Sequence, residues 1–412
     1  MNSRRIVCAV AGLAMAAGAG AAPVVSDVTL TQASPNRLYI DYKLSEPAVV
    51  TFDVLTNGVS IGRELLENFT GDCRKVVKTE SGRIAWKGIT HVWPDVVVPN
   101  KGMTAVVTAW ATNAPPDYMI VDLANTNVSW YVKEEDIPGG TVLRDEYKTT
   151  KLVMRRIHAK GETFRCGVQQ GEPVAGYSST QTPHLVTLTE DFYIGVFELT
   201  QGQWLAVRPQ DDTSTRFSHR GDKLPVDSTG YTGIRGSSTV YHFVTNRYEV
   251  APGGFLGLLR AIANGIRFDL PTSAQWQFAA RAGTQTFYNN GSNFTTGADD
   301  VAWHSGNWAQ DTSLTANNTH EVGLLKPNAW GLYDCHGNVW EVCGDRYQSN
   351  STIPFVDCTD PLGPITESRS FRCGGAYAHS SDYSRSAMRI EQNMENGDYR
   401  NGYRLFAPCE AK

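Results

Sequence analysis

The first third of the chain alternates hydrophobic and polar residues with the two-residue period that is typical of β-strands. β-Branched and aromatic residues recur in four segments, which SPN, TNG and VPNKG turns separate: RLYIDYKL (37–44), AVVTFDVL (48–55), RIAWKGI (83–89) and TAVVTAWAT (104–112). Short strands at this spacing are typical of an antiparallel sandwich of the immunoglobulin or fibronectin type. The pattern therefore predicts a β-sandwich domain over residues 23–123.

The predicted sandwich contains no cluster of ionisable residues, so we expect it to be an adaptor or a spacer. A carbohydrate-binding face around Trp86, Trp93 and Trp110 is the alternative, although burial is the more common outcome for a tryptophan. The next residues, 124–150, contain KEEDIPGG and RDEYKTT, and we expect them to form a polar linker.

From residue 151 onward the alternating pattern gives way to short strands, a few helices and long loops. Two predicted helices begin with a threonine that is followed three residues later by a glutamine: Thr200 with Gln203, and Thr272 with Gln275. In such a capping box each side chain hydrogen-bonds a backbone amide at the start of the helix. These features predict one irregular α+β domain over residues 151–412.

Hydrophobic residues in the predicted helices follow the spacing of an amphipathic helix. Trp276, Ala279 and Ala280 share one face of the second helix, and Gly283 suits the left-handed conformation that ends it. A third helix is predicted in FLGLLRAIANG (255–265), where the last glycine marks the end.

The first 22 residues have the layout of a secretory signal peptide. Arg4 and Arg5 precede an apolar run from Ile6 to Ala17, and small residues follow as far as an A-x-A site near Ala21. This run is too short to span a bilayer, and we expect no membrane span elsewhere in the sequence. We therefore expect an exported protein that is secreted, periplasmic or held at the cell surface.

Composition excludes one class of partner and affects how the cysteines are interpreted. The formal net charge is −5 and the sequence has no basic block, which argues against a nucleic-acid partner. Seven of the eight cysteines follow the predicted cleavage site. In an oxidising compartment most of them should form disulfides, with at least one left free, in a connectivity that the sequence leaves open.

The segment NAWGLYDCHGNVWEVCGDRY (328–347) brings aromatic residues together with acids, a histidine and two cysteines. With five other motifs in a fixed order it resembles the formylglycine-generating enzyme, or sulfatase-modifying factor, family. These motifs are FYIGVFELTQGQW (192–204), FDLPTSAQWQFAARAGT (268–284), FRCGGAY (371–377), SRSAMR (384–389) and NGYRLF (401–406). In addition, GETFRCG (161–167) is similar to the opening strand of that family.

The resemblance covers residues 151–409 and leaves the predicted sandwich unexplained. It implies a C-type-lectin-like fold, with little regular structure around a small twisted sheet. Some family members are oxidases that convert a sulfatase cysteine to formylglycine, and many relatives have other roles. Membership of the fold therefore does not determine the activity.

The same segment is a candidate calcium site. Asp334 and Glu341 offer the hard anionic oxygens that calcium prefers, and Gly337 allows a sharp turn that can aim carbonyl groups inward. The resemblance implies a ligand set of the Asp334 and Glu341 side chains with the carbonyl groups of Gly337 and Val339. A solvated turn, or acids paired with nearby arginines, is the alternative. A second family calcium site would begin at Asn307, but its acidic half is not recognisable here.

The resemblance fails at the catalytic residues. The family's oxidases bind copper(I) between two cysteine thiolates, and the matching positions here hold His379 and Ser384. We therefore do not expect copper. Cys373 is the one other candidate thiol, and a bridge to Cys343 is its simpler fate.

Other polar residues of the predicted domain are expected to be structural. Arg385, Arg389 and Arg404 should anchor loops to carboxylates, and His336 should form hydrogen bonds within its loop. Cys166 and Cys335 should fill the hydrophobic core.

Two functions remain. The first is an exported, calcium-stabilised binding module without oxidase activity, whose ligand is a protein or a glycan. The second is an active formylglycine-generating oxidase, in which His379 and a nearby cysteine would have to approach within metal-binding distance.

Overall fold

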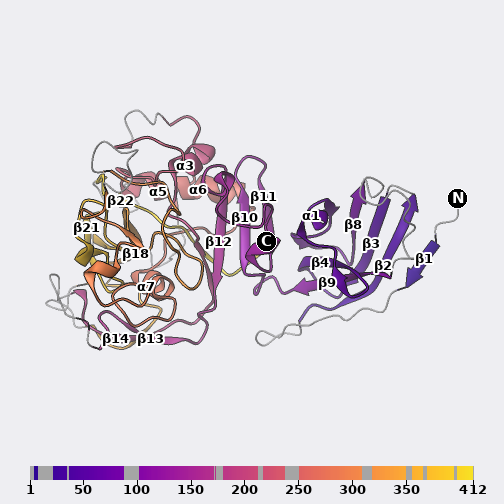
Figure 1. Cartoon of the computed structure of the whole chain (residues 1–412), viewed down its shortest axis with the longest axis horizontal. Helices are drawn as coiled ribbons and strands as arrows, with labels where there is room; N and C mark the ends of the chain where they lie inside the picture. Colours follow the sequence, from indigo (N-terminus) through magenta and orange to yellow (C-terminus); the bar gives the residue numbers. More distant parts are fainter. Residues whose placement is uncertain are drawn as a thin grey trace. The chain divides into compact units, whose positions relative to one another are not determined.

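The structure of the chain is a computed structural model (Figure 1). It describes residues 4–7, 22–34, 37–87, 102–170, 172, 180–211, 217–236, 250–308, 318–348, 355–364, 369–393 and 397–411. The chain divides into two compact units. The first contains residues 1–119, 128–142 and 409–412, and the second contains residues 120–127 and 143–408.

The first unit consists of two antiparallel sheets. The strands of one sheet follow the order β1 (Arg4–Val7), β2 (Val25–Ser34), β3 (Arg37–Leu44), β8 (Ser81–Lys87) and β6 (Phe69–Gly71). The strands of the other are β5 (Val59–Ser60), β4 (Ala48–Thr56), β7 (Val76–Val77) and β9 (Met103–Trp110), the last of which pairs with β4. A short helix, α1 (Arg63–Leu66), follows β5. Strand β1 lies within the predicted signal peptide.

The two sheets share one hydrophobic core, as the alternating pattern predicts. Every second residue of β3 is buried, from Leu38 to Leu44, and β9 alternates in the same way. These side chains belong to a single cluster that draws on both sheets. The antiparallel two-sheet arrangement therefore follows from sequence periodicity, whereas its immunoglobulin or fibronectin type stays a prediction.

The two described tryptophans of the alternative carbohydrate-binding face, Trp86 and Trp110, do not form an exposed surface. Trp86 is only 2% exposed and packs against Phe69, with ring centroids 5.1 Å apart. Trp110 is partly buried and donates a hydrogen bond from Nε1 to Oγ1 of Thr51 at 2.8 Å. Trp93 lies outside the described residues.

The segment that we expected to be a polar linker, residues 124–150, is ordered. The segment follows strand β10 (Tyr118–Asp122). It contains β11 (Asn127–Tyr131), η1 (Glu134–Asp136) and η2 (Asp145–Lys148). Trp130 and Tyr147 are buried. The charged residues of this segment dominate its composition, but its few hydrophobic residues determine how it packs.

The second unit is a mixed α+β structure built from several small sheets. One contains β12 (Lys151–Ile157), β15 (Phe192–Gly195) and β23 (Phe406–Pro408), all antiparallel. Another follows the order β21 (Arg389–Asn393), β20 (Arg369–Cys373), β18 (Trp340–Arg346) and β22 (Asn401–Gly402). The remaining strands are β13 (Thr163–Cys166), β14 (His184–Thr187) and β19 (Cys358–Thr359), then β16 (Ala302–Trp303) with β17 (His336–Gly337).

Within the described residues, four short α-helices lie between these strands, and three of them match the predicted ones. They are α3 (Gln201–Val207), α5 (Tyr231–Arg235), α6 (Phe255–Ile262) and α7 (Ser273–Arg281). Both capping boxes are confirmed, because Thr200 and Thr272 each exchange hydrogen bonds with the glutamine three residues later. Gly283 adopts the expected positive φ of 86° after α7.

The packing of α7 defines the core of the second unit. Trp276, Ala279 and Ala280 lie in one hydrophobic cluster with residues of β18 and β20, including Cys343 and Phe371. Within the described residues, no helix is both long enough and apolar enough to cross a membrane.

Candidate functional site

A buried ion pair lies at the centre of the predicted calcium segment. Arg404 and Glu341 are each 1% exposed, and Nη2 of Arg404 lies 2.6 Å from Oε1 of Glu341. The other Arg404 donors bind the carbonyl oxygens of Gly195, Val196 and Tyr333 at 2.7–3.0 Å. Its Nε donates to Glu341 as well, so all five donors of this guanidinium have acceptors.

Two more buried carboxylates lie close to this pair. Glu198 is fully buried and accepts hydrogen bonds from Nδ2 of Asn338 at 2.6 Å and from the backbone N–H of Val339 at 3.2 Å. Asp334 is 3% exposed and accepts from the backbone N–H of Gly323 at 2.6 Å. Burial is the main reason why the pKa of Asp334 rises to about 6.

Glu198, Asp334 and Glu341 together carry more negative charge than the neighbouring cations balance. Burial raises the pKa of Glu198 well above its usual range, and the charges of Asp334 and Glu341 raise it further. Three carboxylates are thus placed near one guanidinium, and the ammonium group of Lys148, a buried residue, is the other cation that acts on Asp334. Such a cluster is stabilised either by protonation or by an additional cation.

The predicted calcium ligands fit a cation only in part. Oδ1 of Asp334 is buried and has no hydrogen-bond partner among the described residues, so it is available as a ligand. Glu341 is not available in the same way, because Arg404 engages both of its oxygens and Nε1 of Trp276 donates to Oε2 at 2.5 Å. In the described part of the chain, no three His, Cys, Asp or Glu side chains converge as metal ligands.

The backbone around this segment requires glycine at position 337. Gly337 has a φ of 75°, and a Cβ atom there would lie 2.0 Å from the carbonyl oxygen of Trp303. The adjacent Val339 is fully buried. The sharp turn expected at Gly337 is therefore confirmed, while the calcium ligation by the Gly337 and Val339 carbonyl groups stays a prediction.

Asn307 has a structural role in its own loop. Its Oδ1 accepts a hydrogen bond from the backbone N–H of His304, and its Nδ2 donates to the carbonyl oxygen of Ala302, both at 2.8 Å. Both ends of the amide are therefore engaged within the loop, and a cation would have to share Oδ1.

His336 connects the calcium segment to the predicted catalytic region. It is 1% exposed, its Nδ1 lies 2.5 Å from the carbonyl oxygen of Ser384, and its Nε2 accepts from the backbone N–H of Asn289 at 3.1 Å. Burial lowers the pKa of His336 to about 4, so the ring is neutral at pH 7. His336 is thus a hydrogen-bonding residue as expected, but its partners Ser384 and Asn289 lie in other segments and not in its own loop.

His379 lies half-buried in an aromatic and cationic environment. Nε1 of Trp340 donates to Nδ1 of His379 at 3.3 Å, and the ring of Tyr383 lies 5.2 Å away. On the other edge, Nη1 of Arg400 lies 3.5 Å from Nε2. Burial, followed by the charges of Arg400 and Arg372, lowers the pKa of His379 to about 4.

Ser384 does not lie in the same environment as His379. Its side chain is fully buried, and its Oγ has no hydrogen-bond partner among the described residues. Ser384 is the last residue of a 3₁₀ turn, η7 (Ser381–Ser384). Its carbonyl oxygen accepts a hydrogen bond from Nδ1 of His336. Ser384, which occupies the second thiolate position of the sequence motif, therefore lies in the interior of the domain.

The two cysteines nearest to each other are buried in the core. Sγ of Cys343 lies 3.7 Å from Sγ of Cys373, and these residues are 0% and 2% exposed. None of the seven described cysteines forms a disulfide in this structure. Cys166 and Cys335 fill the core as predicted, in the same cluster.

The predicted pairing of arginines with carboxylates is confirmed for Arg404. Arg389 instead donates from Nε to the carbonyl oxygen of Thr180 and lies between the rings of Phe355 and Phe371. Arg385 donates from Nε to the carbonyl oxygen of its near neighbour in η7. For Arg389, a carbonyl group and two aromatic faces thus take the place of the expected carboxylate.

A cavity of about 770 Å³ lies close to His379 in the second unit. Among the residues that line it are Arg369, Arg372, Asp398 and Tyr399. Sequence reasoning missed this group because its members come from β20, from β21 and from the loop before β22. The clustering of Asp398, Tyr399 and Arg400 beside the NGYRLF motif was the available signal.

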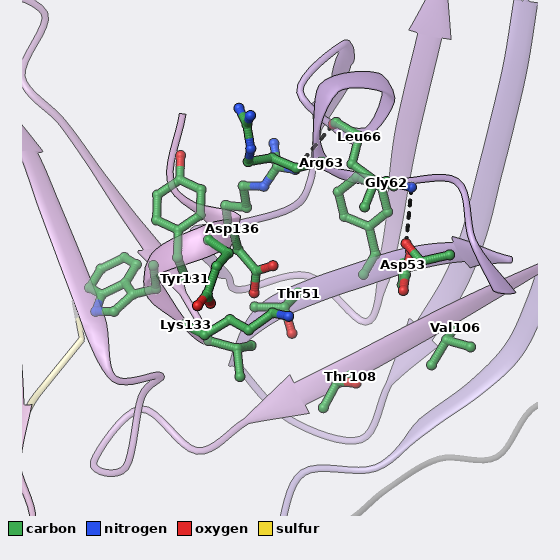
Figure 2. A pocket seen from close by; sticks show the side chains of 16 residues that line it. Thr51, Asp53, Gly62, Arg63, Leu66, Val106, Thr108, Tyr131, Lys133 and Asp136 are labelled. Atoms are coloured by element: carbon green, nitrogen blue, oxygen red, sulfur yellow. Dashed lines mark hydrogen bonds between the residues drawn. The ribbon is translucent and has the colours of Figure 1, made fainter. Parts of the chain in front are cut away.

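The first unit contains a separate cavity of about 550 Å³, on the face of β4 and β9 that points away from the hydrophobic core (Figure 2). Thr51 and Thr108 lie on its floor, and the side chain of Lys133 extends across it toward Thr51 (Figure 2). Trp86 and Trp110 are not among its lining residues. The concave part of this unit therefore differs from the surface that the tryptophans suggested.

Comparison with known proteins identifies the second unit. Residues 149–408 match the model of the "Sulfatase-modifying factor enzyme 1-like domain" family. The chain belongs to the sulfatase-modifying factor family. The predicted start of this domain, residue 151, lies two residues from the start of the match.

Curated relatives of the sulfatase-modifying factor family have more than one role. The chain is 31% identical to "Chaperone protein LppX" of Paenibacillus barcinonensis, over 40% of this chain and 66% of the relative. It is also 31% identical to the "Formylglycine-generating enzyme" of Thermomonospora curvata, over 34% of this chain and 48% of that enzyme. The chain thus spans about half to two thirds of the length of these relatives.

Solved structures of similar fold are more distant in sequence. "Treponema denticola variable protein 1" is 23% identical, with a TM-score of 0.48 over 63% of this chain and 95% of that chain. PvdO from Pseudomonas aeruginosa is 19% identical, with a TM-score of 0.47 over 62% of this chain and 94% of that chain.

Proposed function

We propose that this sulfatase-modifying factor domain is an exported binding module without copper-dependent oxidase activity. The observation that carries the proposal is the nature of the two positions where the family's oxidases have thiolates. His379 offers an imidazole and Ser384 a buried hydroxyl, and a hydroxyl is a poor ligand for copper(I). The environments of the two side chains also differ, since one lies beside Arg400 and the other lies in the interior.

No other thiol pair substitutes for the missing one within the described residues. Cys343 and Cys373 face each other, but they lie inside the core formed by α7, β18 and β20. A peptide cysteine could not approach sulfur atoms that are 0% and 2% exposed without opening this core. Burial also raises the pKa of Cys343 well above its usual range, which disfavours the thiolate that copper requires.

A polypeptide is the favoured ligand for this module. The name of the Paenibacillus relative describes it as a chaperone protein, and a chaperone binds another polypeptide. The cavity beside His379 presents arginines, carboxylates and Tyr399, which are suited to the polar and charged groups of a peptide. A glycan ligand would be the outcome if peptides and proteins fail to bind while oligosaccharides do.

Calcium belongs to this proposal through Asp334, whose buried Oδ1 is free for a cation. A bound cation would add positive charge to a centre with three carboxylates and would stabilise the folded domain. Glu341 would contribute only if it exchanged part of its interaction with Arg404 for the metal.

Copper titration followed by a substrate assay tests the absence of oxidase activity. We expect no stoichiometric tight binding of copper(I) and no aldehyde in a cysteine-containing sulfatase peptide after incubation with oxygen. A double variant with His379→Cys and Ser384→Cys is the matched control, because it restores the two sulfur ligands at the family positions. Tight copper binding together with aldehyde formation by the unmodified chain would overturn the proposal.

A further inference from the structure

The hydrogen bonds of His379 determine which of its ring nitrogens carries the proton. Nε1 of Trp340 can only donate, and it lies 3.3 Å from Nδ1 of His379. Nδ1 must therefore accept, and the neutral ring carries its hydrogen on Nε2. The ring remains neutral at pH 7, since burial and the neighbouring arginines lower the pKa of His379 to about 4.

This tautomer makes His379 and Arg400 two donors that face each other. Nη1 of Arg400 lies 3.5 Å from Nε2 of His379, and a guanidinium group can only donate. Their contact is therefore not a hydrogen bond between them. In the described part of the chain, neither of these two atoms makes another hydrogen bond.

The remaining donors of Arg400 are already occupied. Its Nε and Nη2 donate to the two carboxylate oxygens of Asp398 at 2.9 and 2.6 Å. Asp398 therefore fixes the guanidinium group and leaves Nη1 directed toward His379. An oxygen atom that accepts from both Nη1 and Nε2 would satisfy the two donors together.

The local charge favours an anionic oxygen over a neutral one. Arg372 and Arg400 act on His379 as positive charges, and Asp398 acts on it as a negative charge. With a neutral imidazole, these three groups carry a net charge of +1. The guanidinium group of Arg372 also lies over the ring of Trp340, at 5.2 Å from its centroid, and Arg372 is one of the residues that line the neighbouring cavity.

We propose that His379 and Arg400 together bind a carboxylate of the polypeptide ligand. This inference rests on the proposed function and names the group of the ligand that the module recognises. The position that holds a copper thiolate in the oxidases would serve here as a hydrogen-bond donor to an anion. The carboxylate can come from an acidic side chain or from the C-terminus of the partner.

Nuclear magnetic resonance of the full-length chain with ¹⁵N-labelled histidine reads the tautomer and the binding in one experiment. The His379→Gln variant assigns the signals of this ring among the nine histidines. We expect an unprotonated Nδ1 and a protonated Nε2 at pH 7. A proton on Nδ1 would overturn the inference, because Trp340 and His379 could not then be hydrogen-bonded as described.

Three probes test the ligand class. N-acetylglycine represents a C-terminal carboxylate, the α-amide of N-acetylglutamate represents an acidic side chain, and N-acetylglycine amide is the neutral control. We expect one or both carboxylates to shift the Nε2–H signal and the neutral amide to leave it unchanged. The inference would be overturned if neither carboxylate shifted the Nε2–H signal, or if the neutral amide shifted it as much as a carboxylate does.

Arginine variants localise the binding. Arg400→Gln should lower the affinity for the carboxylate probe about tenfold or more, since a charge-assisted hydrogen bond is lost. Arg369→Gln is the matched control, because Arg369 is an arginine of the neighbouring cavity that pairs with Glu391 and makes no contact with His379, and it should leave the affinity unchanged. Equal affinity in both variants would place the probe elsewhere and contradict the inference. Oxidase activity, by contrast, would reject the proposed function without altering the tautomer.

Discussion

Arg404 and Glu341 form an ion pair that is buried on both sides, with 1% of each side chain exposed and 2.6 Å between Nη2 and Oε1. The two residues are 63 positions apart and connect the strand β18 to the chain just before β23. Because the guanidinium group also binds three carbonyl oxygens, it joins three segments of the domain at one point.

Truncation of Arg404 should destabilise the domain strongly. Arg404→Ala leaves Glu341 as a buried charge without its partner, which typically costs about 3–5 kcal/mol of unfolding free energy. Urea unfolding of the full-length chain, followed by a signal of the second unit, measures this loss. The double variant with Glu341→Gln and Arg404→Met removes both charges and should recover part of the stability. A loss below about 1 kcal/mol in Arg404→Ala would contradict the central role of the pair.

Calcium should raise the melting temperature of the chain through Asp334. At a concentration one hundred times its dissociation constant, a ligand that binds only the folded state adds about 2.7 kcal/mol. Asp334→Asn should abolish the increase, because it weakens the oxygen ligand. This variant suits the site, since asparagine tolerates the φ of 55° at this position and keeps an acceptor for the N–H of Gly323.

Differential scanning calorimetry with calcium and with a chelator compares the two chains. The Asp334→Asn variant should melt at the same temperature in both conditions. If the melting temperature of the unmodified chain were the same with calcium and with the chelator, calcium binding at this position would be ruled out. Glu341→Gln is a less clean probe, because it disturbs the Arg404 ion pair whether or not calcium binds.

His336 should make the second unit less stable as the pH falls. Its pKa in the folded chain is about 4, below the usual value of 6.5, so the unfolded chain binds more protons between these values. Stability is therefore complete above about pH 6.5 and is lost as the pH falls toward 4, by roughly 3 kcal/mol in total.

A comparison with His336→Gln isolates this contribution. Glutamine can still donate to the carbonyl oxygen of Ser384 and accept from the N–H of Asn289, but it does not titrate. The raised pKa of Asp334 acts in the opposite direction over part of the same range and is present in both chains. The variant should lose less stability than the unmodified chain between pH 7 and pH 5. Parallel curves would contradict the prediction.

The sequence predicts the local features of this domain better than its long-range ones. The capping boxes at Thr200 and Thr272 involve residues three positions apart, so their signals lie within one short segment. Glu198 belongs to an equally short motif, yet its partner Asn338 is 140 positions away. Periodicity and turn signals carry no information about which distant segments meet, so the position of Glu198 beside Asp334 and Glu341 could not be predicted.

The candidate site also has features that the sequence predicts and features that it does not predict. The loss of both thiolates at His379 and Ser384 follows directly from the motif, because it depends only on residue identity. The contact of His379 with Arg400 depends on how the loop before β22 folds back, and no local pattern indicates it. The buried Trp130 in the expected linker is a similar case, since surrounding charged residues concealed one short strand.

Cys343 and Cys373 should form a disulfide when the chain folds in an oxidising compartment. Their sulfurs lie 3.7 Å apart on neighbouring strands, and bond formation requires an approach to about 2.05 Å. Because both thiols are buried in the folded domain, exchange with a small-molecule disulfide should occur before the core closes. Each thiol loses its proton, and the small-molecule disulfide is reduced to two thiols.

Peptide mass analysis without reduction detects the bridge after refolding with oxidised glutathione. We expect one cross-linked peptide pair that contains Cys343 and Cys373, and a melting temperature above that of the reduced chain. The bridge closes a loop of about 30 residues, which is worth roughly 3.6 kcal/mol in the chain-entropy model. Cys343→Ser should lower the melting temperature of the oxidised chain to nearly that of the reduced one. If alkylation of the unfolded, unreduced chain modifies both cysteines fully, the two thiols pack as core residues and the prediction is wrong.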